Sequence, residues 1–84
     1  MSEDDIERGK LKFRETARRL GPSARLEIKP LADGNYNVVF TMGGKTSRMD
    51  MNDDRFADFA NKGMVGADIT NRIKSALHEI GALV

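Results

Sequence analysis

Few residues in this chain could carry out acid–base or metal chemistry, and the single histidine is the first candidate. His78 lies about 180° from Ile69 on a helical wheel, so we expect its imidazole to face solvent. The chain has no cysteine, which excludes a thiolate nucleophile, a cysteine metal site and a disulfide framework. No acid–base pair stands at a catalytic spacing. The sequence therefore predicts a protein that is not an enzyme, with no catalytic residues, metal site or cofactor.

Two glycine-containing motifs suggest ligand binding, but each lacks part of its pattern. Residues 43–46 (GGKT) match the end of a phosphate-binding P-loop, yet Val39 occupies the position of its first glycine and a predicted strand follows. We interpret this motif as a hairpin turn. Residues 63–66 (GMVG), between two predicted helices, resemble the GxxG loop of KH RNA-binding domains, which clamps a nucleic-acid backbone. The alternative for the Gly63–Gly66 loop is a plain turn between helices.

The charged residues are the main candidates for contact with a partner. Fourteen Lys and Arg and thirteen Asp and Glu give a net charge of +1, so any recognition must come from local patches. One acidic and two basic groups stand out. The acidic group is Asp50, Asp53, Asp54 and Asp58; the basic groups are Arg8, Lys12 and Arg19 on the predicted first helix, and Arg25, Lys29 and Arg48 on the predicted sheet.

Each charged group has a functional and a structural interpretation. The acidic group could hold a divalent cation, imitate DNA phosphates or contact a partner, but acids also stabilise a helix N-terminus. Basic and amide groups on an open sheet could enter a DNA groove, as in β-ribbon readers, or could form a solvated face. Glu27 lies among these basic residues, and no aromatic residue is available there for stacking on bases.

The first element that must position these groups is a helix over residues 4–20. Ile6, Phe13, Ala17 and Leu20 fall on one apolar stripe, acids occupy the first turn, and Gly21-Pro22 ends the helix. Gly9 disfavours helix in the first turns, so the ordered part is expected to begin near residue 10.

The period of the apolar residues changes from 3.6 to 2 at Arg25, which predicts three strands. Turns at Asp33 and at residues 43–44 connect them as an antiparallel meander, with one apolar and one polar face. The expected register pairs Phe40 with Ser47, Val38 with Met49 and Tyr36 with Met51, and, across the turn at Asp33, Ile28 with Phe40 and Leu26 with Met42.

Two helices complete the predicted order α-β-β-β-α-α. Asn52 or Asp53 caps the first of them, which ends at Gly63, and the second runs from about Asp68 to a C-terminal cap at Gly81. The sequence therefore predicts one α+β domain over residues 1–84, with the helices on the apolar face of the sheet. The predicted core comprises Leu26, Ile28, Tyr36, Val38, Phe40, Phe56, Phe59, Ile73 and Leu77.

Composition gives a prediction for the location of the protein. No apolar run reaches the length of about 18 residues needed to span a membrane, and acids at residues 3–5 are the reverse of a signal peptide. The absence of cysteine fits a reducing compartment. We therefore expect a cytoplasmic protein with no membrane contact.

Residues 43–80 combine a glycine hairpin, an acid-capped short helix, a glycine-broken turn and an amphipathic helix. With the small size, this pattern resembles small phage-encoded inhibitors, in particular some anti-CRISPR proteins. The resemblance implies a protein that occludes a nucleic-acid site or locks an effector complex. We expect a regulatory or inhibitory protein, a monomer or weak homodimer, that binds a protein or nucleoprotein complex. The alternative is direct DNA or RNA binding through the basic sheet face or the Gly63–Gly66 loop.

Overall fold

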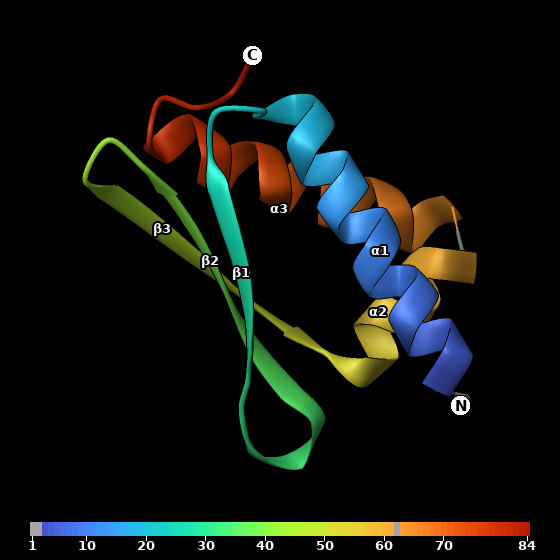
Figure 1. Cartoon of the computed structure of the whole chain (residues 1–84). Coiled ribbons are helices and arrows are strands. Elements are labelled where there is room, and N and C mark those ends of the chain that lie inside the picture. Colours follow the sequence, from blue (N-terminus) through green and yellow to red (C-terminus); the bar gives the residue numbers. More distant parts are fainter. Residues whose placement is uncertain (1–2, 62) are drawn as a thin grey trace.

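The computed structural model describes residues 3–61 and 63–84, which form three helices packed on one face of a three-stranded sheet (Figure 1). The order α-β-β-β-α-α and the antiparallel meander confirm the predicted α+β fold. The elements are α1 (Glu3–Leu20), β1 (Arg25–Pro30), η1 (Ala32–Gly34), β2 (Asn35–Met42), β3 (Lys45–Asn52), α2 (Asp53–Asn61) and α3 (Gly63–Glu79).

The register between β2 and β3 confirms the prediction. Gly43 and Gly44 both have positive φ angles, as a two-residue hairpin turn requires, and this turn fixes the pairing of the strands. The pairs include Phe40 with Ser47, Val38 with Met49 and Tyr36 with Met51.

The predicted register between β1 and β2 is wrong by two residues. The connection has three residues, as expected, but it lies over Ala32–Gly34, one residue earlier than the predicted pairing requires. Leu31 donates its backbone N–H to the carbonyl of Asn35 at 2.7 Å, and Asp33 adopts a left-handed conformation with φ 60°. Side chains alternate along a strand with a period of two, so this shift leaves the same residues on the core face. The observed pairs are Leu26 with Phe40 and Ile28 with Val38, in place of Leu26 with Met42 and Ile28 with Phe40.

Phe13 of α1 lies at the centre of the hydrophobic core. Its ring centroid is 6.3 Å from that of Phe40 on β2, 5.7 Å from that of Phe56 and 6.2 Å from that of Phe59, both on α2. All four phenylalanines are buried, so this cluster joins α1 to the sheet and to α2. Of the predicted core, Val38, Phe40, Phe56, Phe59, Ile73 and Leu77 are buried, whereas Leu26, Ile28 and Tyr36 are half-buried and pack against its edge.

Gly9 allows α1 to cross α2 at close range. A Cβ atom at this position would lie 1.8 Å from the carbonyl oxygen of Phe56, so no residue larger than glycine fits without displacing a helix. The helix predicted over residues 4–20 is confirmed as Glu3–Leu20. The prediction that its ordered part begins near residue 10 is wrong, since packing on α2 offsets the low helix propensity of glycine.

Helix α3 begins five residues earlier than predicted, at Gly63 rather than Asp68. Residues 63–66 therefore form the first turn of a helix. The interpretation of these residues as a KH-like loop is wrong, and so is the alternative of a plain turn between helices. The prediction that Gly63 ends α2 is also wrong, because Gly63 belongs to α3. A Cβ atom on Gly66 would lie 3.8 Å from the ring of Phe59. Packing of α3 against α2 at this point offsets the low helix propensity of the glycines.

The chain leaves α3 through a glycine turn that directs it back to α1. Gly81 has a φ of 72°, and the N–H of Ala82 bonds to the carbonyl of Leu77 at 2.8 Å, which confirms the predicted C-terminal cap. The N–H of Val84 then donates to the carbonyl of Leu20 at 2.8 Å. The last residues thus connect the ends of α3 and α1.

Candidate functional site

Tyr36 is at the centre of a polar cluster that joins β2 to both α1 and α2. Its hydroxyl donates to a carboxylate oxygen of Asp53 at 2.5 Å, and Lys10 Nζ lies 4.5 Å from its ring centroid and 3.4 Å from a carboxylate oxygen of Glu7. The hydrogen bond to Asp53, followed by burial, raises the pKa of Tyr36. Burial by itself lowers the pKa of Lys10, but its contacts with Tyr36 and Glu7 outweigh burial and raise that pKa. The cluster holds three elements together with a protonated phenol.

The predicted acidic group is divided between two elements. Asp50 is exposed on β3, and the other three carboxylates are on α2. Asn52, rather than Asp53, is the N-cap residue, because its side-chain oxygen accepts the backbone N–H of Arg55 at 2.8 Å. Asp53 is bound to Tyr36, as described above. Among the described residues, no three His, Cys, Asp or Glu side chains are placed to hold a metal ion.

The basic residues predicted on the first helix have different surroundings. Arg8 pairs with Asp5 one turn earlier. Lys12 donates its ammonium group to the carbonyl of Phe59 at 2.8 Å, near the C-terminus of α2, and lies 4.7 Å from the ring centroid of that residue. Arg19 is exposed and has no carboxylate within ion-pair distance in the described part of the chain. Of these three predicted residues, Arg8 and Lys12 thus have partners within the fold, and Arg19 has no carboxylate partner among the described residues.

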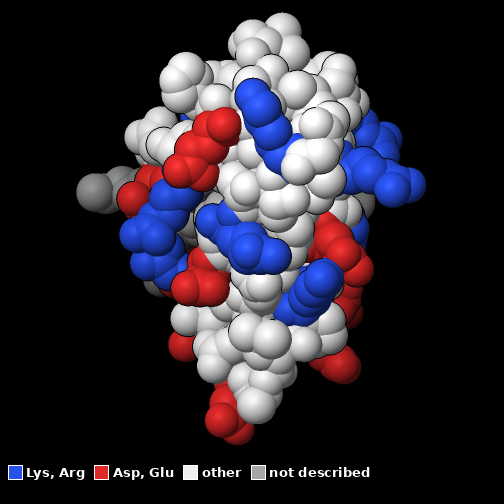
Figure 2. Space-filling view, turned by 90° about the vertical axis from the view of Figure 1, so that its left-hand side faces the viewer, with Lys and Arg blue, Asp and Glu red and all other residues white. Residues whose placement is uncertain are grey.

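The basic residues of the sheet, Arg25, Lys29 and Arg48, are exposed. Lys29 Nζ lies 3.7 Å from a carboxylate oxygen of Glu27. Val39, which pairs with Glu27 on one side and with Arg48 on the other, is only 8% exposed. Figure 2 views the molecule from the side of the sheet and shows positive and negative side chains interspersed, with only acidic ones toward the β1–β2 turn. The sheet face is therefore charged with both signs.

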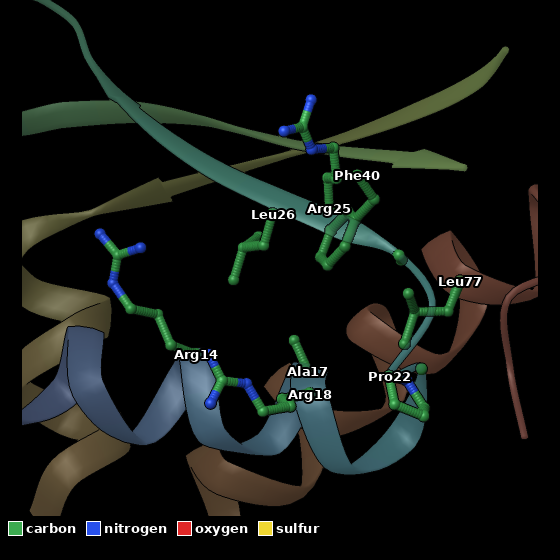
Figure 3. A pocket seen from close by; sticks show the side chains of 10 residues that line it. Arg14, Ala17, Arg18, Pro22, Arg25, Leu26, Phe40 and Leu77 are labelled. Carbon is green, nitrogen blue, oxygen red and sulfur yellow. The ribbon is translucent and has the colours of Figure 1, made fainter. Parts of the chain in front are cut away.

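A cavity that the sequence did not predict lies between the second half of α1 and the start of β1 (Figure 3). Its volume is about 350 Å³. The side chains of Ala17 and Leu26 point into it from α1 and β1, and Phe40 and Leu77, both fully buried, close its inner end. The cavity thus has apolar walls where α1 diverges from the edge of the sheet.

Two arginines of α1 border this cavity. Arg14 extends from α1 toward the sheet, and Arg18 follows one turn later, whereas the side chain of Arg25 points to the other side of β1 (Figure 3). All three are exposed, and none has a carboxylate within 4.0 Å among residues 3–61 and 63–84. The cavity therefore combines apolar walls with two uncompensated guanidinium groups.

The positive charge is concentrated in this part of the chain. Residues 14–25 contain four arginines and one glutamate, a formal charge of +3, while the whole chain carries +1. We use the term arginine surface for Arg14, Arg18, Arg19 and Arg25. Sequence reasoning selected Arg19 and Arg25 of this set and missed the other two. One feature of the sequence indicates that Arg14 and Arg18 lie close to the core: they are one helical turn apart and flank Ala17 of the apolar stripe.

Two results complete the description of the site. No helix in the described ranges combines the length and the apolar character needed to cross a lipid bilayer. Comparison of the chain with protein-family models, curated proteins and solved structures finds no match.

Proposed function

We propose that this chain is a non-enzymatic regulatory or inhibitory protein that binds a larger protein, alone or within a nucleoprotein complex, through its arginine surface. One observation carries this proposal: the second half of α1 and the start of β1 carry four exposed arginines, none with a carboxylate partner in the described part of the chain. Arginine binds carboxylates through two parallel hydrogen bonds and is enriched at protein interfaces. An acidic patch on a partner would satisfy these groups.

Several of the other charged candidates already have a partner within the fold. Asp53 is bound to Tyr36, Arg8 is paired with Asp5, and Lys12 is bound to the carbonyl of Phe59. A charged group that already has a partner within its own fold must give up that partner to bind another, so it contributes less to association. The arginine surface has no such internal competitor.

The position of the aromatic residues favours a protein partner over direct nucleic-acid binding. Proteins that bind single strands stack bases on exposed aromatic rings. All four phenylalanines are buried here, and the only tyrosine is half-buried and bound to Asp53. Duplex binding through the sheet face would also bring Glu27 and Asp50 close to phosphates.

Reversing the charge of the arginine surface tests the proposal. The variant Arg18→Glu with Arg19→Glu changes the net charge by −4, and the control Lys45→Glu with Lys74→Glu makes the same change outside the surface. Tagged proteins are used to capture partners from a lysate, with quantitative mass spectrometry. We expect wild type and control to retain one set of proteins that the arginine variant loses. Equal capture by all three would contradict the proposal.

Direct nucleic-acid binding is measured in parallel. Labelled DNA and RNA are titrated with the purified protein at about 50 and 200 mM salt, because phosphate contacts weaken steeply over this range. We expect no tight binding at either salt concentration. Tight binding at low salt that the arginine variant loses would assign the surface to nucleic acid instead.

A further inference from the structure

We propose that the cavity between α1 and β1 binds one extended segment of the protein partner. The segment pairs with the free edge of β1, places an apolar side chain in the cavity, and directs two acidic side chains at alternate positions toward Arg14 and Arg18. This inference rests on the proposed function and specifies the chemistry of the partner.

The edge of the sheet supplies the backbone contacts. β1 pairs with β2 on one side only, so its other side is a sheet edge. In an antiparallel pair, every second residue directs its N–H and C=O groups away from its neighbour, and such edges bind extended peptides by adding a strand. Ala24, Arg25 and Leu26 line the cavity, so the edge and the cavity meet at the start of β1.

The two arginines set the spacing of the acidic residues. Positions 14 and 18 are one helical turn apart, which corresponds to a rise of about 6 Å along the axis of α1. Alternate residues of an extended strand are about 6.6 Å apart and point to the same face. α1 and β1 line opposite sides of the cavity and approach each other toward Pro22 (Figure 3), and the spacing of two carboxylates at alternate positions of an added strand is close to the spacing of positions 14 and 18.

The apolar walls account for the third side chain. Ala17 and Leu26 face the cavity from opposite sides, and its volume of about 350 Å³ accommodates a leucine or valine side chain. A bare phosphate or a nucleic-acid backbone would satisfy the arginines but would leave these walls in contact with water. An acidic and apolar segment satisfies both parts of the site.

The opposite edge of the sheet lacks this combination. A cavity of about 420 Å³ lies between β3 and α3, and its walls carry Arg48, Asp50, Asp68, Arg72 and Glu79. Arg72 is already paired with Asp68 at 3.4 Å. Charges of both signs compensate each other there, so that cavity selects no ligand of one sign.

A peptide titration monitored by NMR tests the inference on the whole chain. The probe is the acetylated and amidated peptide Ser-Glu-Thr-Glu-Thr-Leu-Ser, in which both glutamates and the leucine share one face of a strand. Proton–nitrogen correlation spectra are recorded for the wild type, for Arg14→Glu with Arg18→Glu, and for the control Lys45→Glu with Lys74→Glu, which makes the same change in net charge outside the arginine surface. The neutral pair Arg14→Gln with Arg18→Gln replaces the first variant if its spectrum shows loss of fold.

We expect saturable shifts at Ala17, Ala24 and Leu26 in the wild type. The affinity should fall at least about tenfold when Arg14 and Arg18 are replaced, and by less than about threefold in the control. A peptide with lysine in place of both glutamates should not bind. A peptide N-methylated at alternate residues should also fail to bind, because it cannot pair with the strand edge.

Three results would overturn the inference. The first is the absence of a saturable shift with about 5 mM peptide. The second is a set of shifts that map away from α1 and β1. The third is binding of the lysine peptide or the N-methylated peptide with the same affinity as the original peptide. If the peptide fails while the arginine variant of the capture experiment still loses its partners, the proposed function stands and this inference falls. If the capture is also insensitive to the arginines, both fall.

Discussion

Replacement of Gly9 by alanine should destabilise the fold, although alanine is the better helix former. The added Cβ would lie 1.8 Å from the carbonyl oxygen, 2.4 Å from the carbonyl carbon and 2.9 Å from the Cα of Phe56. All three atoms are backbone, so no side-chain rotation relieves the contact. Ordinary contact begins at about 3.4 Å, so the two helices must move apart by about 1.6 Å at their crossing.

The magnitude follows from two opposing effects. Alanine in a helix gains about 1 kcal/mol over glycine. Separating the helices loosens the ring contact between Phe13 and Phe56, whose centroids are 5.7 Å apart, at a cost of about 3–5 kcal/mol for overpacking and lost core contact. We expect a net loss of about 2–4 kcal/mol in the free energy of unfolding, and a melting temperature lower by about 10–20 °C.

Urea unfolding followed by circular dichroism measures this change, with Gly66→Ala as the matched control. A Cβ at Gly66 would find its nearest neighbour, the ring of Phe59, at an ordinary 3.8 Å. Gly66→Ala should therefore leave the stability unchanged or raise it by up to about 1 kcal/mol. If Gly9→Ala proves as stable as Gly66→Ala, the close crossing of α1 and α2 at Gly9 is refuted.

Three further predictions concern the interior. Tyr36, the only tyrosine, should ionise with a midpoint above pH 10 in an ultraviolet titration, because its pKa is raised by the hydrogen bond to Asp53. Because this pKa is raised in the folded state, the stabilisation from the protonated Tyr36 hydroxyl is fully present below pH 10 and is lost as the pH rises through the folded-state pKa. Tyr36→Phe should remove this alkaline loss of stability. Urea unfolding at pH 8 and at about pH 11 measures the difference. Ser47→Ala should cost about 1–2 kcal/mol in urea unfolding, because the buried Ser47 hydroxyl donates to the carbonyl of Ala76 at 2.7 Å, and an unchanged midpoint would contradict this. Phe40→Ala should cost about 3–5 kcal/mol by leaving a cavity in the core, and a melting temperature equal to wild type would show that the assignment of the core face is wrong.

The sequence predicted those parts of the fold that depend on local geometry. A two-residue turn at Gly43-Gly44 leaves one pairing that places the apolar residues on one face, and this register is observed. The turn near Asp33 has no such signature, and its compact conformation follows from the Leu31–Asn35 hydrogen bond. Alternation of side chains fixes the face of β1 but not its position along β2.

Features that depend on packing between distant segments could not be predicted. Glycines at positions 9 and 66 disfavour helix in isolation, and the contacts of α1 and α3 with α2 offset this preference. The hydrogen bond of Lys12 could not be predicted, because its acceptor, the carbonyl of Phe59, is 47 residues away in the sequence. The candidate site was missed for the same reason, since the cavity beside Arg14 and Arg18 exists only where α1 diverges from β1.

The Phe13 cluster also has a consequence for how the chain reaches this fold. Helix α1 is synthesised before the elements that cover Phe13, because their rings come from β2 and from α2, which follow later in the chain. The strands of the meander, in contrast, find their neighbours within a few residues of each turn. Closing the long loop between α1 and α2 carries an entropic cost that local hairpins avoid. We therefore expect the meander to form early and the docking of α1 to limit the folding rate, so that α1 remains exposed to chaperones until α2 has emerged.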